Sequence, residues 1–261
     1  MSNLIKGSIL LLVILAIGAG LVVWKNNVGA SHATVASFNK ITKEEIELLL
    51  ADLAKQNPMV LKRFEQDPTM KKQQLDNLKQ LLTFASEAKR EGMHLEPTNR
   101  QELENIRAEV AAVNYDKEIN KGPMPPFGFI SEDQVNAFWA QTPQTGFLAS
   151  LKQKVGLGEE NHEEAFLKFL DSKVAILKSG NPSMKDREIS DEERNQARDF
   201  FAKIEIYEKE FDQKANAGEL PKEFVDKVNL QVKLQQAQFL AQLFSKKSAE
   251  QLKVTDEEVD K

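Results

Sequence analysis

The chain has 261 residues, of which 41% are hydrophobic and 29% are charged, a composition that argues against a disordered or fibrous protein. The net charge of −5 argues against a nucleic-acid partner. The sequence contains no cysteine, which excludes disulfides, thiolate metal sites and a cysteine nucleophile.

The first predicted element is an apolar helix near the N-terminus. Residues 7–24 carry no charged side chain and are bounded by Lys6 and Lys25. At about 1.5 Å per residue, a helix of this length spans roughly the hydrocarbon core of a bilayer. We therefore expect residues 1–30 to hold a single-pass anchor in a bacterial-type inner (cytoplasmic) membrane. The positive-inside tendency places residues 26–261 outside the cytoplasm, in the periplasm.

A cleaved signal peptide is the alternative interpretation of this segment. Small residues stand at the required positions in residues 28–30 and again in residues 31–33. The apolar stretch is longer than the core of a usual signal peptide, which favours an uncleaved anchor. Under either interpretation the rest of the chain is exported.

Signals typical of helix starts follow a short β-prone run at residues 34–38. In a capping box, a Ser or Thr side chain and a Glu or Gln three residues later each bond the other's backbone amide. Asn-Pro and Asp-Pro pairs mark further starts, because proline is tolerated where no helical donor is needed. With only 12 glycines and 9 prolines in the chain, these signals predict an all-α body. The boxes are 42–45, 98–101, 131–134, 190–193 and 255–258, and the proline starts are Asn57-Pro58, Asp67-Pro68 and Asn181-Pro182.

Apolar side chains recur at helical spacing in four of the predicted helices. Such stripes are expected to pack against one another and to form the core. They comprise Leu75, Leu78, Leu82 and Ala85; Leu103, Ile106, Val110 and Val113; Ala197, Phe200, Ile204, Tyr207 and Phe211; and Leu230, Leu234, Ala237, Ala241 and Phe244.

A loop is predicted at residues 122–130, where three prolines and two glycines prevent a regular helix. The loop contains Met124, Phe127 and Phe129. These side chains either present an apolar edge to a client chain or cover the core beneath the loop. Both interpretations stay open, and the three residues are our candidates for client binding.

The predicted helices suggest a body made of two separated segments. We expect residues 34–121 and residues 189–261 to form one helical body, so that distant parts of the chain meet in space. Residues 122–188 would then be an insertion into that body or an addition beside it.

The sequence offers no motif for catalysis, for a cofactor or for a metal ion. His162 stands beside Glu163 and Glu164, but no second histidine follows four residues later. Many carboxylates lie three or four residues from a lysine, which is typical of exposed pairs on helices. We therefore assign no catalytic residue, no cofactor and no metal ligand.

Three segments of the sequence occur in a distinctive order: residues 35–45 read V-A-S-F-N-K-I-T-K-E-E, residues 81–93 read L-L-T-F-A-S-E-A-K-R-E-G-M, and residues 254–259 read V-T-D-E-E-V. This order resembles the helical chaperone region of the SurA-like and PrsA-like foldases, which are parvulin-type peptidyl-prolyl isomerases. Lys40 replaces the glycine that the family has after the asparagine. The family's histidine-bearing isomerase motif does not occur in the sequence.

The resemblance implies a helical fold like the peptide-binding domains of SurA and trigger factor. It also implies a membrane-anchored, extracytoplasmic chaperone-like protein whose partners are unfolded or nascent exported polypeptides, without isomerase activity of its own. A truncated or split membrane-tethered peptidyl-prolyl cis-trans isomerase is one alternative. An envelope scaffold with a fixed partner is another.

Overall fold

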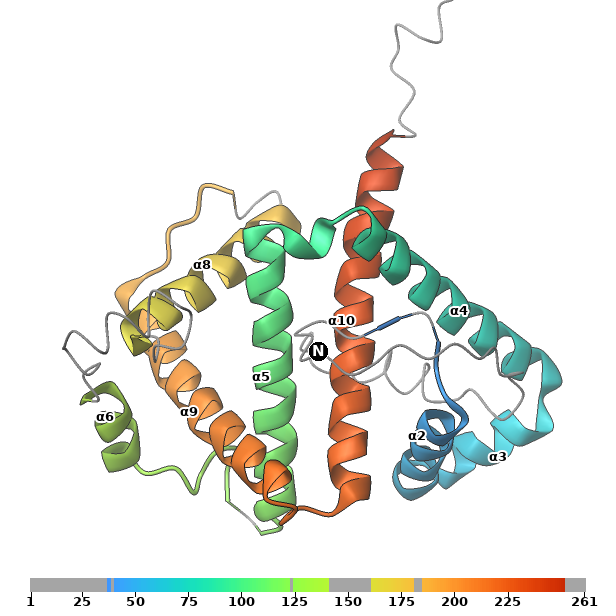
Figure 1. Cartoon of the computed structure of the whole chain (residues 1–261), viewed down its shortest axis with the longest axis horizontal. Helices are drawn as coiled ribbons and strands as arrows, with labels where there is room; N and C mark the ends of the chain where they lie inside the picture. Colours follow the sequence, from blue (N-terminus) through green and yellow to red (C-terminus); the bar gives the residue numbers. More distant parts are fainter. Residues whose placement is uncertain (1–36, 39, 123, 141–160, 181–184, 252–261) are drawn as a thin grey trace, which may run out of the picture. The chain divides into compact units, whose positions relative to one another are not determined.

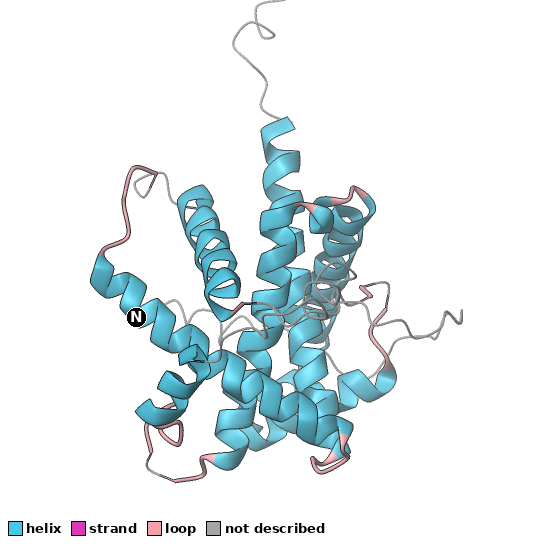
Figure 2. Cartoon of the chain, turned by 60° about the vertical axis from the view of Figure 1, so that its left-hand side comes forward, coloured by secondary structure: helices cyan, strands magenta, loops and turns pink. Residues whose placement is uncertain are grey.

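The structure is a computed structural model, and it is helical in the part of the chain that it describes. No strand occurs in this part (Figure 2). The prediction of an all-α fold is therefore confirmed for these residues. Within the β-prone run, Ser37 and Phe38 lie in no strand, and residues 34–36 are outside the described part. The described residues are 37–38, 40–122, 124–140, 161–180 and 185–251.

The predicted membrane anchor lies outside the described residues, because these begin at Ser37. Among the helices that are described, none is both long enough and apolar enough to cross a bilayer.

The helices divide into two compact units, and one of them is made of two separate chain segments. The first unit consists of the chain up to His94 together with the chain from Pro221 onward. The second unit is Leu95–Leu220. These boundaries fall after residues 94 and 220, whereas the sequence suggested boundaries after residues 121 and 188. The first unit contains α2 (Lys43–Gln56), α3 (Pro58–Gln66), α4 (Pro68–Arg90) and α10 (Lys222–Gln251). The second contains α5 (Pro97–Ile119), α6 (Glu132–Ala140), α8 (His162–Gly180) and α9 (Asp191–Asn216), and a 3-10 turn, Met93–Leu95, precedes it.

In the first unit, α10 packs along α4 and also contacts α2 (Figure 1). The rings of Phe84 on α4 and Phe244 on α10 lie 5.4 Å apart. The ammonium of Lys233 on α10 donates to both carboxylate oxygens of Glu45 on α2, at 2.8 and 2.9 Å. Early and late segments of the chain therefore meet in this unit.

In the second unit, α5 packs against both α9 and α8, and α6 contacts α9 and α8. An aromatic cluster joins α6, α8 and α9. Phe201 on α9 is 3% exposed and its ring contacts the rings of Phe138, Trp139, Phe166 and Phe169. This cluster packs α6, the helix that follows the loop described below, against α8 and α9.

Three of the predicted capping boxes are present. Thr42 and Glu45 bond each other's backbone amides, at 2.7 and 3.1 Å. Ser190 and Glu193 form the same reciprocal pair at the start of α9, and residues 131–134 do so at the start of α6. The predicted starts at Pro58 and Pro68 are also confirmed.

The predicted box at 98–101 is wrong. Helix α5 begins at Pro97, with Glu96 as its N-cap and no side-chain bond to the cap. Proline is favoured at the first helical position, so the helix starts before Thr98. The box at 255–258 and the start at Asn181-Pro182 lie outside the described residues.

Candidate functional site

The loop that joins α5 to α6 has a backbone held by four hydrogen bonds. Asn120 is the C-cap of α5. Its side-chain amide donates to the backbone carbonyl oxygens of Met124 and Pro125, both at 3.2 Å. The backbone amide of Gly128 donates to Pro125 at 2.9 Å, and that of Ile130 donates to Phe127 at 3.1 Å. The described residues of the loop, 120–122 and 124–130, therefore form a hydrogen-bonded turn, which we call the fixed turn.

Phe127 is the buried member of the three candidate side chains. Its ring is 7% exposed and lies against two residues of α9, with centroid distances of 5.6 Å to Tyr207 and 6.0 Å to Phe200. Its φ of 59° is unusual for a bulky residue, so the packing of the ring holds the backbone in this conformation. Phe127 covers the core, which is the second of the two interpretations offered by the sequence.

Met124 and Phe129 are the exposed members. Their side chains are 42% and 50% exposed, on either side of the buried Phe127. We call these two residues the apolar edge. Phe200, whose ring contacts Phe127, is 41% exposed, although the sequence pattern assigned it to the core. The structure thus separates the candidates into one core residue and two exposed residues.

A polar cluster formed by residues of α5 and α9 adjoins Phe127 through the ring of Tyr207. The rings of Tyr115 and Tyr207 meet edge to face, 5.5 Å apart. The Tyr115 hydroxyl donates to Glu210 at 2.8 Å and accepts from Lys214 at 2.6 Å. Burial, together with nearby Asp116 and Glu210, raises the pKa of Tyr207 to about 12. Tyr207 therefore stays protonated at physiological pH and is unsuited to act as a general base.

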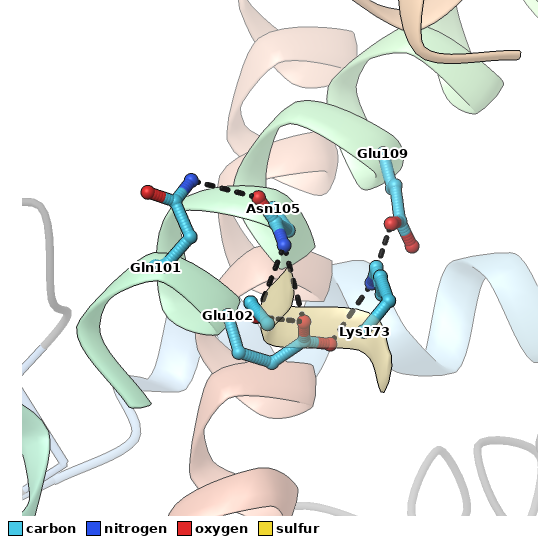
Figure 3. A network of polar contacts seen from close by, with 6 residues as sticks. Gln101, Glu102, Asn105, Glu109 and Lys173 are labelled. Atoms are coloured by element: carbon cyan, nitrogen blue, oxygen red, sulfur yellow. Dashed lines mark hydrogen bonds and ion pairs between the residues drawn. The ribbon is translucent and has the colours of Figure 1, made fainter. Parts of the chain in front are cut away.

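A second polar network joins α5 to α8 (Figure 3). Glu102 accepts from the Lys173 ammonium at 2.9 Å and from the Ser172 hydroxyl at 3.1 Å. Asn105 donates to Glu102 at 3.2 Å, and Lys173 also pairs with Glu109 at 2.5 Å. Burial alone would lower the pKa of Lys173, but the two carboxylates raise it above its ordinary value. The lysine is therefore a charged bridge between helices and not a neutral nucleophile.

The third network joins α5 to α9 through Arg107. Its guanidinium pairs with Glu208 and with both carboxylate oxygens of Asp212, the latter at 2.7 and 2.8 Å. Burial raises the pKa of Glu208 to about 7, and Glu205 and Asp212 act in the same direction, while Arg107 opposes them. Glu208 thus changes its charge near neutral pH.

None of these networks forms a metal site. Among the described residues, no group of three His, Asp or Glu side chains is arranged to hold a metal ion. His162, singled out in the sequence, stacks on the ring of Phe138 with centroids 3.8 Å apart. Its imidazole belongs to the aromatic cluster at the start of α8.

Comparisons with known proteins gave no match: no family model fits the chain, and no curated protein and no solved structure is significantly similar to it.

Proposed function

We propose that the protein is a membrane-anchored, extracytoplasmic chaperone-like protein that binds apolar segments of unfolded, exported polypeptides at the apolar edge. The observation that carries the proposal is the exposure of Met124 and Phe129 on a fixed turn. The apolar segment at residues 7–24 and the resemblance to the SurA-like and PrsA-like foldases support the anchor and the class of client.

The geometry of the loop suits such binding for two physical reasons. A loop whose backbone is already ordered loses little conformational entropy when a client binds. Methionine is flexible and polarizable, so Met124 adapts to side chains of different shape, and Phe129 supplies a large apolar surface. Burial of apolar area contributes about 25 cal/mol per Å², so a small edge gives weak and reversible binding. Weak binding of varied sequences is what a holding chaperone requires.

The proposal is tested with the 261-residue chain in lipid nanodiscs, which accommodate the apolar N-terminal segment. The double variant Met124→Ser/Phe129→Ser is compared with Met59→Ser/Leu177→Ser. The control side chains are 69% and 52% exposed and lie on α3 and α8, away from the loop in sequence. The readouts are aggregation of a chemically denatured model protein and the affinity for that client.

We expect the wild-type chain to slow aggregation. The loop variant should bind the client about tenfold more weakly, because it loses about 1–2 kcal/mol of apolar burial. The control variant should behave like the wild type. Equal affinities of the loop variant and the wild type would remove the apolar edge from the proposal, and a wild-type chain without any effect on aggregation would refute the chaperone function.

The two alternatives from the sequence predict different results. A peptidyl-prolyl isomerase would accelerate the isomerisation of a proline peptide. An envelope scaffold would retain one stoichiometric partner in a pull-down instead of a heterogeneous set of polypeptides.

A further inference from the structure

The two units carry charge of opposite sign. The second unit, Leu95–Leu220, has 24 acidic and 16 basic side chains and thus a net charge of −8. The whole chain carries −5, so the remaining residues are net positive. The apolar edge therefore belongs to the acidic unit, whose field attracts cationic ligands.

Local charges at the loop have the same sign. Glu132 and Asp133 follow Phe129 by three and four residues and are both exposed. At no more than 3.8 Å per residue, their backbone lies within about 15 Å of Phe129, which is at most about two Debye lengths at physiological salt. Neither carboxylate forms an ion pair with another of the described residues. Both are therefore available to a cationic ligand.

The basic side chains near the loop offset this charge in part. Lys121 is exposed, but its ammonium pairs with Glu118 at 3.0 Å. Lys117 lies one turn earlier, in the last turn of α5, where helix carbonyl groups favour a cation. The start of α6 thus carries two negative charges, three and four residues after Phe129, that form no ion pair with another of the described residues.

We propose that the apolar edge selects client segments in which apolar residues are flanked by lysine or arginine. The inference rests on the proposed function and specifies its substrate class. The apolar residues of the client lie on Met124 and Phe129, and its cationic side chain reaches Glu132 and Asp133. Long lysine and arginine side chains suit this arrangement, because their methylene stems cover apolar surface while the charged group extends to the carboxylates.

The test uses two short peptides with the same apolar core, one flanked by lysines and one by glutamates. Their affinities for the 261-residue chain in nanodiscs are measured by fluorescence anisotropy. We expect the lysine-flanked peptide to bind about tenfold more tightly. Raising the salt from about 0.1 M to about 1 M shortens the Debye length from about 10 Å to about 3 Å and should reduce this ratio.

The variant Glu132→Gln/Asp133→Asn should lower the ratio at least about threefold. Its matched control is Asp191→Asn/Glu192→Gln, which makes the same change in net charge at exposed positions in the first turn of α9. The control should keep the wild-type ratio. Circular dichroism of each variant verifies that the helices remain.

The outcomes separate this inference from the proposed function. Equal binding of the two peptides, or an equal loss of preference in both variants, would overturn the selection by Glu132 and Asp133 and leave the chaperone function intact. If neither peptide binds and the denatured client does not bind either, the proposed function itself fails.

Discussion

Arg107 on α5 donates to both carboxylate oxygens of Asp212 on α9, at 2.7 and 2.8 Å, across 105 residues of sequence. The same guanidinium pairs with Glu208, so one cation serves two acids at the contact between the helices. The two acids lie four residues apart on α9 and would repel each other without it.

The first prediction concerns the loss of this cation. Arg107→Ala should lower the free energy of unfolding of the second unit by about 1–3 kcal/mol, because a largely buried Glu208 then lacks its counter-charge. Arg100→Ala is the control, since Arg100 pairs with Glu104 at an exposed position. This control should cost less than about 0.5 kcal/mol. Urea denaturation measures both changes, and equal effects would contradict the role of the shared cation.

The second prediction is a pH dependence. The pKa of Glu208 is raised from 4.5 to about 7. Between these two pH values the folded chain keeps a proton on Glu208 that the unfolded chain has released. This contribution to stability is complete below about pH 4.5 and is lost as the pH rises through 7. It amounts to at most about 3 kcal/mol.

Glu208→Gln isolates this contribution, because the amide stays neutral at every pH. The difference in unfolding free energy between the variant and the wild type should therefore change in favour of the variant as the pH rises from 5 to 8. A difference that is constant over this range would show that Glu208 does not titrate there. Arg107→Ala should raise the pKa of Glu208 further, because the opposing charge is gone.

The third prediction compares two adjacent phenylalanines of α9. Phe201 is 3% exposed and lies in the aromatic cluster, whereas Phe200 is 41% exposed. Phe201→Ala should cost about 3–5 kcal/mol of stability, and Phe200→Ala about 1 kcal/mol. The fluorescence of Trp139, whose ring contacts Phe201, should change in the first variant. Similar losses for the two variants would contradict the packing of α9.

The fourth prediction tests the turn that holds the apolar edge. A Cβ atom at Gly128 would lie 2.8 Å from the carbonyl oxygen of Pro125, so Gly128→Ala forces the loop backbone to move. We expect a loss of about 1–3 kcal/mol in stability and weaker client binding with Met124 and Phe129 still present. Gly122→Ala has open space around the added methyl group and should be neutral. Client binding that survives Gly128→Ala would mean that the fixed turn is not needed.

Helix starts were predictable because their signals are local. A capping box at Ser190 and Glu193 needs only residues within three positions of each other, and the structure confirms it. The error at Thr98 arose because two local signals compete there. The capping box predicted a start at Thr98, but the helix begins at the proline at position 97.

The packing of α9 was predictable only in part. Ile204, Tyr207 and Phe211 are buried, as the stripe predicted. The stripe included Phe200, which is exposed, and left out Phe201, which is buried. The two residues are 100° apart on a helix. Which of them is buried depends on where α6 and α8 lie, and this information is absent from the pattern of one helix. Arg107 and its partners were missed for the same reason.

The candidate loop illustrates the same limit. Its prolines and glycines predicted a break, and its apolar residues raised two alternatives. In the structure the outcome differs between neighbouring residues: Phe127 is buried and covers the core, whereas Met124 and Phe129 are exposed. The positive φ of Phe127 turns its ring toward Tyr207, and such a conformation follows from the tertiary packing and not from residue type.

The split construction of the first unit has a consequence for synthesis on the ribosome. The second unit is one uninterrupted stretch and can fold as soon as it emerges, whereas α4 waits for α10. At about 5–20 residues per second, the stretch from Arg90 to Lys222 delays that partner by on the order of ten seconds. During this interval Phe84 on α4 lacks its partner Phe244 on α10. The unfinished chain then exposes apolar side chains, as do the unfolded polypeptides that we propose it binds.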